Sequence, residues 1–129
     1  MMVDAIGIAG SGMTVHRKWL DAIADNLANA NTATATNNAA FQERYIVAQE
    51  GTGNVGASAS AAFGSAEGTI VYEPEHPLAD ADGYVRYPEI DMAKQMGNLI
   101  MAQRGYQANA AVVDRAKTAY EAALQIGRG

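Results

Sequence analysis

The chain of 129 residues contains 9 Lys plus Arg against 14 Asp plus Glu, giving a formal net charge of −5. This acidic balance argues against a nucleic-acid partner, and the absence of cysteine excludes disulfides, thiolate catalysis and cysteine–zinc sites. Aromatic residues are only 7% and the apolar side chains are mostly small, so we expect assembly with other chains to supply burial that a monomer lacks.

Residues 3 to 29 carry the first helical pattern. Apolar and small side chains recur at alternating steps of three and four, which keeps one face of a helix aimed at a partner helix. Three glycines among the first dozen residues lower helix propensity by up to about 1 kcal/mol each relative to alanine. We therefore expect this dozen to form a separate short helix or to order only on docking. The pattern stops in residues 29–32, which favour caps and turns.

The N-terminus differs from a Sec-type signal peptide. It has no Lys or Arg before Arg17 and no continuous apolar run. No stretch approaches about 18 consecutive apolar residues, so we expect no membrane insertion. A protein with these features that leaves the cytoplasm is expected to do so without a cleavable signal.

Residues 33–86 predict a small β-rich insert. Within it, short β-favouring runs occupy residues 41–47, 70–72 and 84–87. Between these runs, residues 51–68 are rich in Gly, Ala and Ser and predict a flexible loop. Asp82 and Gly83 form a hairpin-type turn signal.

The last third, residues 87–127, predicts a long helix. Pro88 suits its first position, Asp91 favours its positive N-terminal end, and Gly127 is the expected stop. At about 1.5 Å per residue the helix would be roughly 55 Å long. Its apolar stripe is broken by Gln103 and Lys117, which are either solvated flank residues or polar positions that set the register of a helical bundle.

The fold class that follows is mainly α, with long N- and C-terminal helices paired in a coiled-coil-like manner and a small β-rich insert. We expect the helices, in residues 1–32 and 87–129, to form one helical core domain, and residues 33–86 to form the insert. The apolar stripes of both helices define a candidate assembly interface, whose members are Ile6, Met13, Leu20, Ile23, Leu27, Met96, Leu99, Tyr106, Val113, Tyr120 and Leu124.

Several motifs suggest ligand sites, but each lacks the required context. Gly51–Gly56 matches G-x-G-x-x-G, yet no helical pattern follows it, so we expect a loop rather than a dinucleotide site. Residues 78–89 resemble half of an EF-hand, but Leu78 occupies the first ligand position. The two histidines lie in different segments, and His16 is expected to be a solvated helix residue. We therefore expect no catalytic residue, no metal site, no cofactor and no small-molecule substrate.

Two terminal segments resemble those of a known family. Asp25–Thr32 (DNLANANT) and Tyr106–Val113 (YQANAAVV) resemble the N- and C-terminal motifs of the bacterial flagellar rod, hook and hook-associated proteins. Val71–Val85 (VYEPEHPLADADGYV), followed by the last helix, resembles the corresponding part of the short proximal-rod members. His76 stands where that group usually has asparagine, and residues 33–68 match little beyond length.

This resemblance implies a structural subunit of the basal-body rod that assembles helically and transmits motor torque, without catalysis. It also implies export by the flagellar type III apparatus and assembly in the periplasm. The implied partners are further copies of the chain, other rod proteins and the junction with the MS ring. The alternative class is a helical-hairpin adaptor that binds one partner in a closed complex.

Overall fold

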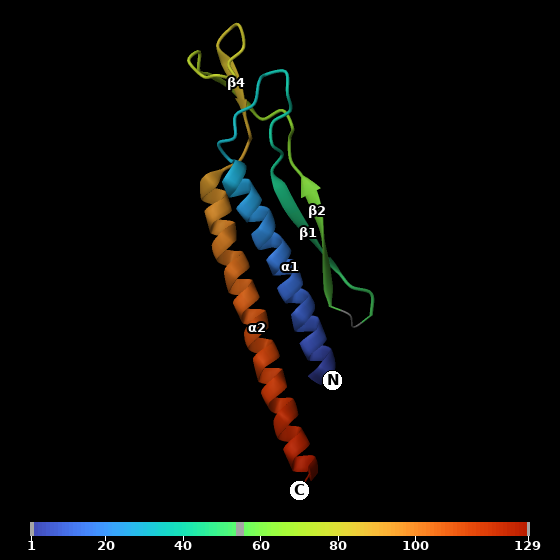
Figure 1. The fold of residues 1–129 in the computed structure, drawn as a ribbon. Helices are drawn as coiled ribbons and strands as arrows, with labels where there is room; N and C mark the ends of the chain where they lie inside the picture. The colour runs from blue at the N-terminus through green and yellow to red at the C-terminus, as the bar shows by residue number, and fades with distance from the viewer. Residues whose placement is uncertain (1, 54–55, 129) are drawn as a thin grey trace. The chain divides into compact units, whose positions relative to one another are not determined.

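The computed structural model describes residues 2–53 and 56–128. In chain order, the elements are α1 (Met2–Asn29), β1 (Arg44–Glu50), β2 (Ala57–Phe63), β3 (Thr69–Tyr72), β4 (Tyr84–Tyr87) and α2 (Met92–Arg128) (Figure 1). The strands form two two-stranded sheets, β1–β2 and β3–β4. The expectation of a mainly α chain with a small β insert is confirmed. No helix in the described part of the chain is long and apolar enough to cross a membrane.

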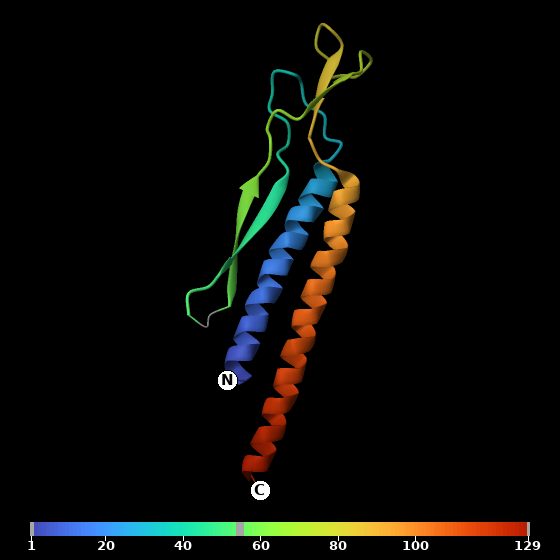
Figure 2. The same cartoon turned by 180° about the vertical axis from the view of Figure 1, so that it is seen from behind.

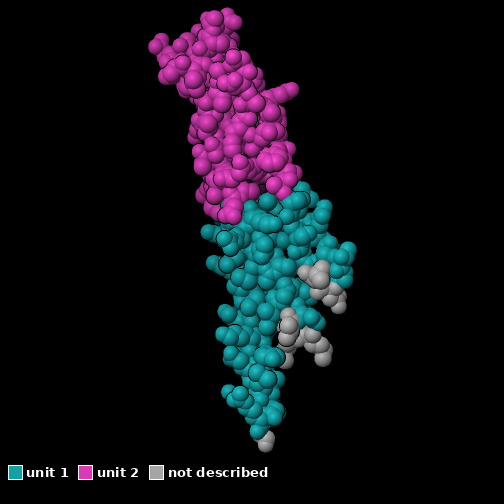
Figure 3. Space-filling model, turned by 45° about the vertical axis from the view of Figure 1, so that its right-hand side comes forward, with its two compact units in different colours: residues 1–20, 46–60, 100–129 teal, residues 21–45, 61–99 magenta. Residues whose placement is uncertain are grey.

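The chain divides into two compact units (Figure 3). Unit 1 holds residues 1–20, 46–60 and 100–129, and unit 2 holds residues 21–45 and 61–99. Each unit therefore contains a part of α1, a part of α2 and a part of the segment between the helices. Seen from both sides, β1 and β2 lie next to each other as a ribbon (Figures 1 and 2).

The N-terminal helix is continuous, which corrects the expectation of a separate short helix over the first dozen residues. α1 runs without a break from Met2 to Asn29. Packing explains why three glycines do not interrupt it: Ala9 is buried, and Gly12 lies against Asn109 of α2 within unit 1. Tertiary contacts of this kind contribute more to a helix than intrinsic propensity does.

The C-terminal helix begins five residues later than the sequence suggests. β4 extends to Tyr87, where it pairs with Thr69, so Pro88 follows a strand and does not open a helix. The helix starts at Met92, and Asp91 is its cap: Oδ1 accepts the backbone N–H groups of Ala93 at 2.9 Å and Lys94 at 3.2 Å. At the other end, α2 continues through the predicted stop to Arg128.

The stretch predicted as a flexible loop contains a strand. Residues 57–63 form β2, which pairs with β1, whereas the rest of residues 51–68 is irregular where described. The small alternating side chains of β2 give no apolar signal. β2 is ordered because its backbone pairs with that of β1, and this pairing does not depend on large side chains. Residues 54 and 55 of this stretch lie outside the described chain.

The β3–β4 hairpin confirms the two β-favouring runs. Val71 lies opposite Val85 and Tyr72 opposite Tyr84. Val85 is fully buried on one face, so the tyrosines occupy the other face, because successive residues of a strand alternate. Gly83 has a φ of 86°, the positive value expected for the turn signal before β4.

Candidate functional site

Within unit 1, the backbones of α1 and α2 approach closely. A Cβ atom added at Gly12 would lie 2.9 Å from the Asn109 amide, and one added at Gly105 would lie 2.1 Å from the His16 ring. A step of four residues forward on α1 thus matches a step of four back on α2, so the two segments run antiparallel. Missing side chains at the two glycines make this approach possible.

The C-terminal end of α2 continues past the described part of α1. Extending the unit 1 register by ten residues leads from Gly12 back to Met2 and from Asn109 on to Ala119. Residues 120–128 therefore have no residue of the described α1 opposite them. Large apolar side chains are left in solvent here, with exposed fractions of 42% for Tyr120, 49% for Leu124 and 82% for Ile126.

Within unit 2, a buried polar network joins α1, β1 and α2. Asn26 Oδ1 accepts the backbone N–H of Arg44 at 2.8 Å, and Asn26 Nδ2 donates to the Arg44 carbonyl at 2.9 Å. The same Nδ2 donates to Gln95 Oε1 at 3.1 Å, and Gln95 Nε2 donates to Glu43 Oε1 at 2.6 Å. The Tyr45 hydroxyl donates to Glu43 Oε2 at 2.6 Å. Satisfied networks of this kind favour one arrangement of the elements they join.

Charged side chains also contact Tyr45 and Arg44 of this network. The hydrogen bond to Glu43 raises the pKa of the Tyr45 hydroxyl above its ordinary value, because the carboxylate accepts a bond that only the neutral phenol can donate; burial and the Glu43 charge act in the same direction. Arg44 also forms a salt bridge with Asp25 of α1. The Lys94 ammonium lies 5.9 Å from the centre of the Tyr45 ring.

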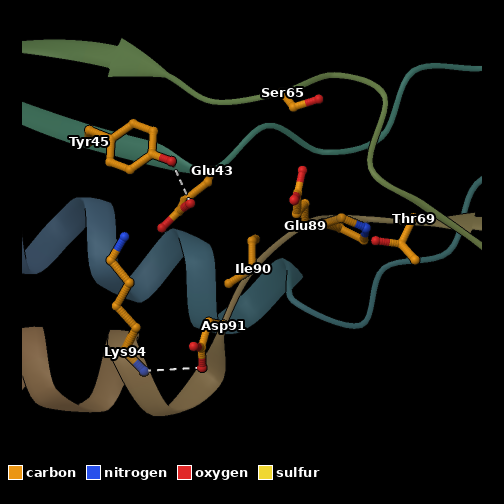
Figure 4. A pocket seen from close by; sticks show the side chains of 9 residues that line it. Glu43, Tyr45, Ser65, Thr69, Glu89, Ile90, Asp91 and Lys94 are labelled. Atoms are coloured by element: carbon orange, nitrogen blue, oxygen red, sulfur yellow. Dashed lines mark hydrogen bonds between the residues drawn. The ribbon is translucent and has the colours of Figure 1, made fainter.

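A pocket of about 670 Å³ opens beside the network in unit 2 (Figure 4). Three carboxylates and one ammonium group line it, so it favours a cationic group over an anionic one. Neither a thiol nor a histidine is present to act as nucleophile or base. Its lining residues are Glu43, Tyr45, Ser65, Thr69, Pro88, Glu89, Ile90, Asp91 and Lys94.

The residues of the predicted assembly interface differ in burial. One is buried, several are half-buried and three are exposed. The buried residue is Ile23. The half-buried ones are Ile6, Met13, Leu20, Leu27, Leu99, Tyr106 and Val113, and the exposed ones are Met96, Tyr120 and Leu124. Whether they contact other subunits stays a prediction, because burial within one chain does not test it.

The intrachain packing of α2 uses positions next to several that the sequence pattern selects. Gln95 and Ala102 are buried, whereas their neighbours Met96 and Gln103 are exposed. A search for large apolar side chains misses these positions, since polar and small residues occupy them. Of the network residues, Asn26 could have been identified from the sequence, because it lies in the DNLANANT motif. Gln95 and Glu43 lie in no such motif.

The remaining sequence motifs have structural roles. His16 is half-buried, which corrects the expectation of a solvated residue, and its Nδ1 lies 2.8 Å from the Gly12 carbonyl. His76 Nδ1 accepts the backbone N–H of Leu78 in the β3–β4 loop. The carboxylate of Asp80 accepts the N–H groups of Asp82 and Tyr84, so it orders a turn. No group of three or more His, Asp or Glu side chains in residues 4–53 and 56–128 could hold a metal ion.

Comparison with known proteins gives consistent matches. Residues 81–126 match the family described as flagellar basal body rod FlgEFG protein C-terminal. The flagellar basal-body rod protein FlgC of Salmonella typhimurium is 35% identical over 133 residues, covering 98% of both chains. The protein of the same name from Escherichia coli O157:H7 is 34% identical with the same coverage. The one from Bacillus subtilis is 26% identical, over 96% of this chain and 97% of its own.

Proposed function

As a member of the FlgC family of flagellar basal-body rod proteins, the chain is a structural subunit of the rod, and we propose that it assembles helically through its terminal helices to transmit motor torque. The full-length similarity to relatives with this name carries the first part. The second part rests on the apolar surface that the helices leave open. In this proposal α1 and α2 pair along their lengths in a coiled-coil-like core.

The accessible area supports assembly. The chain exposes 8490 Å², whereas a compact monomer of 13.5 kDa exposes roughly 6,500 Å². The excess of about 2,000 Å² is as large as a complete standard protein–protein interface. Buried apolar side chains in the described part of the chain are mostly alanine. Contacts with neighbouring subunits would therefore contribute much of the apolar burial.

The partners in this proposal are further copies of the chain, other rod proteins and the junction with the MS ring. Head-to-tail contacts that do not close produce open helical assemblies, which suits a rod. Export through the flagellar type III apparatus and assembly in the periplasm complete the proposal. A mechanical role of this kind requires no cofactor and no catalytic step.

Two methionines of α2 test the terminal-helix interface. Met96 lies on the predicted stripe and Met101 lies off it, and both are about half exposed in the monomer. Met96→Asp should prevent incorporation into basal bodies, because assembly would bury an unpaired carboxylate at a cost of several kcal/mol. Met101→Asp introduces the same charge at similar exposure and should be mild.

Basal bodies purified from cells and probed by immunoblot give the measurement, with circular dichroism of each purified variant to verify folding. Equal incorporation of the two variants would show that the stripe does not form the interface. Saturation of the purified wild-type chain in a closed one-to-one complex with one partner would instead support an adaptor.

A further inference from the structure

Three methionines of α2 are open to solvent. Met92 and Met96 lie in unit 2 with exposed fractions of 44% and 49%, and Met101 lies in unit 1 with 55%. Met13 of α1 is half-buried by comparison. An oxidant reaches a thioether according to its exposure, and the chain has no cysteine whose thiol would react first. The three thioethers of α2 are therefore accessible to two-electron oxidants in the free chain.

Met92 and Met96 lie next to each other on α2. They are four residues apart, so their side chains share one side of the helix. Met96 belongs to the stripe proposed to bind neighbouring subunits, and Met92 extends this stripe towards the start of the helix. Met101 lies off the stripe. The first two thioethers thus occupy the proposed interface, and the third is a reference residue of similar exposure.

Oxidation would change what this surface can bind. A sulfur lone pair attacks one oxygen of hydrogen peroxide, the O–O bond breaks, and the proton of the transferred hydroxyl moves to the departing hydroxide. The sulfur is oxidised to the sulfoxide, and the peroxide is reduced to water. A flexible apolar side chain thereby gains a polar S=O group. Burying that group against apolar side chains, with no donor to satisfy it, is unfavourable.

We propose that Met92 and Met96 form an oxidation site that controls assembly. As thioethers they complete the apolar surface that a neighbouring subunit covers, and as sulfoxides they prevent that subunit from binding. Assembly in turn shields both sulfurs, so the site reacts with peroxide only in chains that are not yet incorporated. The proposal rests on the proposed rod function and adds a chemical control of the same surface.

Oxidation footprinting tests the dependence on assembly. Dilute hydrogen peroxide is added to the purified chain and to purified basal bodies, and peptide mass spectrometry measures the sulfoxide at each methionine. In the purified chain Met92, Met96 and Met101 should react at similar rates. In basal bodies the rates at Met92 and Met96 should fall by roughly fivefold or more relative to Met101, because a neighbouring subunit covers them. Undiminished oxidation of both residues in basal bodies would overturn the proposal.

Leucine substitution tests the consequence in cells, because leucine is apolar and of similar volume but cannot be oxidised. One strain carries the wild-type chain, one carries Met92→Leu with Met96→Leu, and the control carries Met101→Leu. Peroxide is added while new rods assemble, and immunoblots compare incorporation into basal bodies with the untreated culture of the same strain. Incorporation of the wild-type and Met101→Leu chains should fall by roughly threefold or more, and that of the double variant much less.

An equal loss of incorporation in the three strains would overturn the control of assembly. Circular dichroism of the purified double variant verifies its folding. If leucine at both positions prevents incorporation without peroxide, the footprint of the wild-type chain decides alone. Wild-type chain missing from the basal bodies of untreated cells would instead overturn the proposed function.

Discussion

Asn26 satisfies two backbone groups of a neighbouring strand with one side chain. Its carbonyl oxygen and its amide nitrogen bond the N–H and the C=O of Arg44, as a paired strand would. An aspartate could accept from the N–H but could not donate to the C=O, and a leucine could do neither. The DNLANANT segment thus connects the last turns of α1 to the start of β1, and Gln95 extends the connection to α2 within unit 2.

Replacing Asn26 should therefore destabilise the chain strongly. Asn26→Ala removes the side-chain partner of the Arg44 N–H and C=O, which are part-buried, and of the buried Gln95 amide oxygen. Each buried group left unsatisfied costs about 1–3 kcal/mol. Denaturant unfolding followed by circular dichroism measures the change. Asn37→Ala removes the same side chain at an exposed position and should change stability little. If the two variants unfold alike, the network does not hold the elements together.

Asp80 should make the β3–β4 loop sensitive to acid. The backbone N–H of Tyr84, and next the Thr36 hydroxyl, donate to its carboxylate and lower its pKa below the ordinary value. A lowered folded-state pKa stabilises the fold above the unfolded pKa of about 3.9, and this stabilisation is lost as pH falls through the folded pKa.

Asp80→Asn should consequently lower stability at neutral pH and flatten the loss of stability on acidification. Urea unfolding at a series of pH values, with Asp82→Asn as the control on the same turn, gives the comparison. A wild-type acid dependence that survives in Asp80→Asn would assign it to other carboxylates.

At the scale of the elements, two glycines of α2 have different structural roles. Gly97 has open space where a Cβ atom would lie, whereas a Cβ atom at Gly105 would meet the His16 ring at 2.1 Å. Helix propensity alone gives both glycines the same unfavourable value, so the sequence could not distinguish them. Only the packing of α1 on α2 in unit 1 shows that Gly105 is needed.

This difference predicts that a Gly→Ala substitution has a different effect on stability at each of the two glycines. Gly97→Ala should stabilise the protein by up to about 1 kcal/mol through helix propensity. Gly105→Ala should gain less or destabilise, because the His16 ring must move and its Nδ1 contact with the Gly12 carbonyl would be disturbed. Thermal unfolding of the two variants measures the order. Equal stabilisation would mean that the ring moves freely and that the helices are not closely packed there.

The sequence predicted the elements that side-chain pattern determines. Both helices and the β3 and β4 runs follow from apolar periodicity and from β-branched and aromatic residues. β2 could not be predicted, because six of its seven residues are Ala or Ser and its order depends on pairing with β1. The start of α2 was missed since Pro88 and Asp91 both suit a helix start, and only the extent of β4 decides between them. The buried network was not predicted, because apolar periodicity gives no information about polar positions.

At the scale of the whole molecule, the assembly residues remain a prediction for a physical reason. A sequence shows which helix faces are apolar, but a face covered by the same chain and a face covered by another subunit have the same composition. The structure separates them in part, by showing that Tyr120 and Leu124 have no described α1 residue opposite and stay exposed. The surface still open in one chain is where a neighbouring subunit can bind.

The last prediction follows from that open surface. In the dilute monomer, backbone amides of residues 120–128 should exchange hydrogen rapidly, because this end of α2 lacks packing to oppose fraying. Amides around Gln95 should exchange more slowly, since the buried network must open first. In purified basal bodies the end of α2 should become protected by neighbouring subunits. Hydrogen exchange with mass spectrometry on both samples measures this; equally strong protection of residues 120–128 in a proven monomer would show that the end needs no partner.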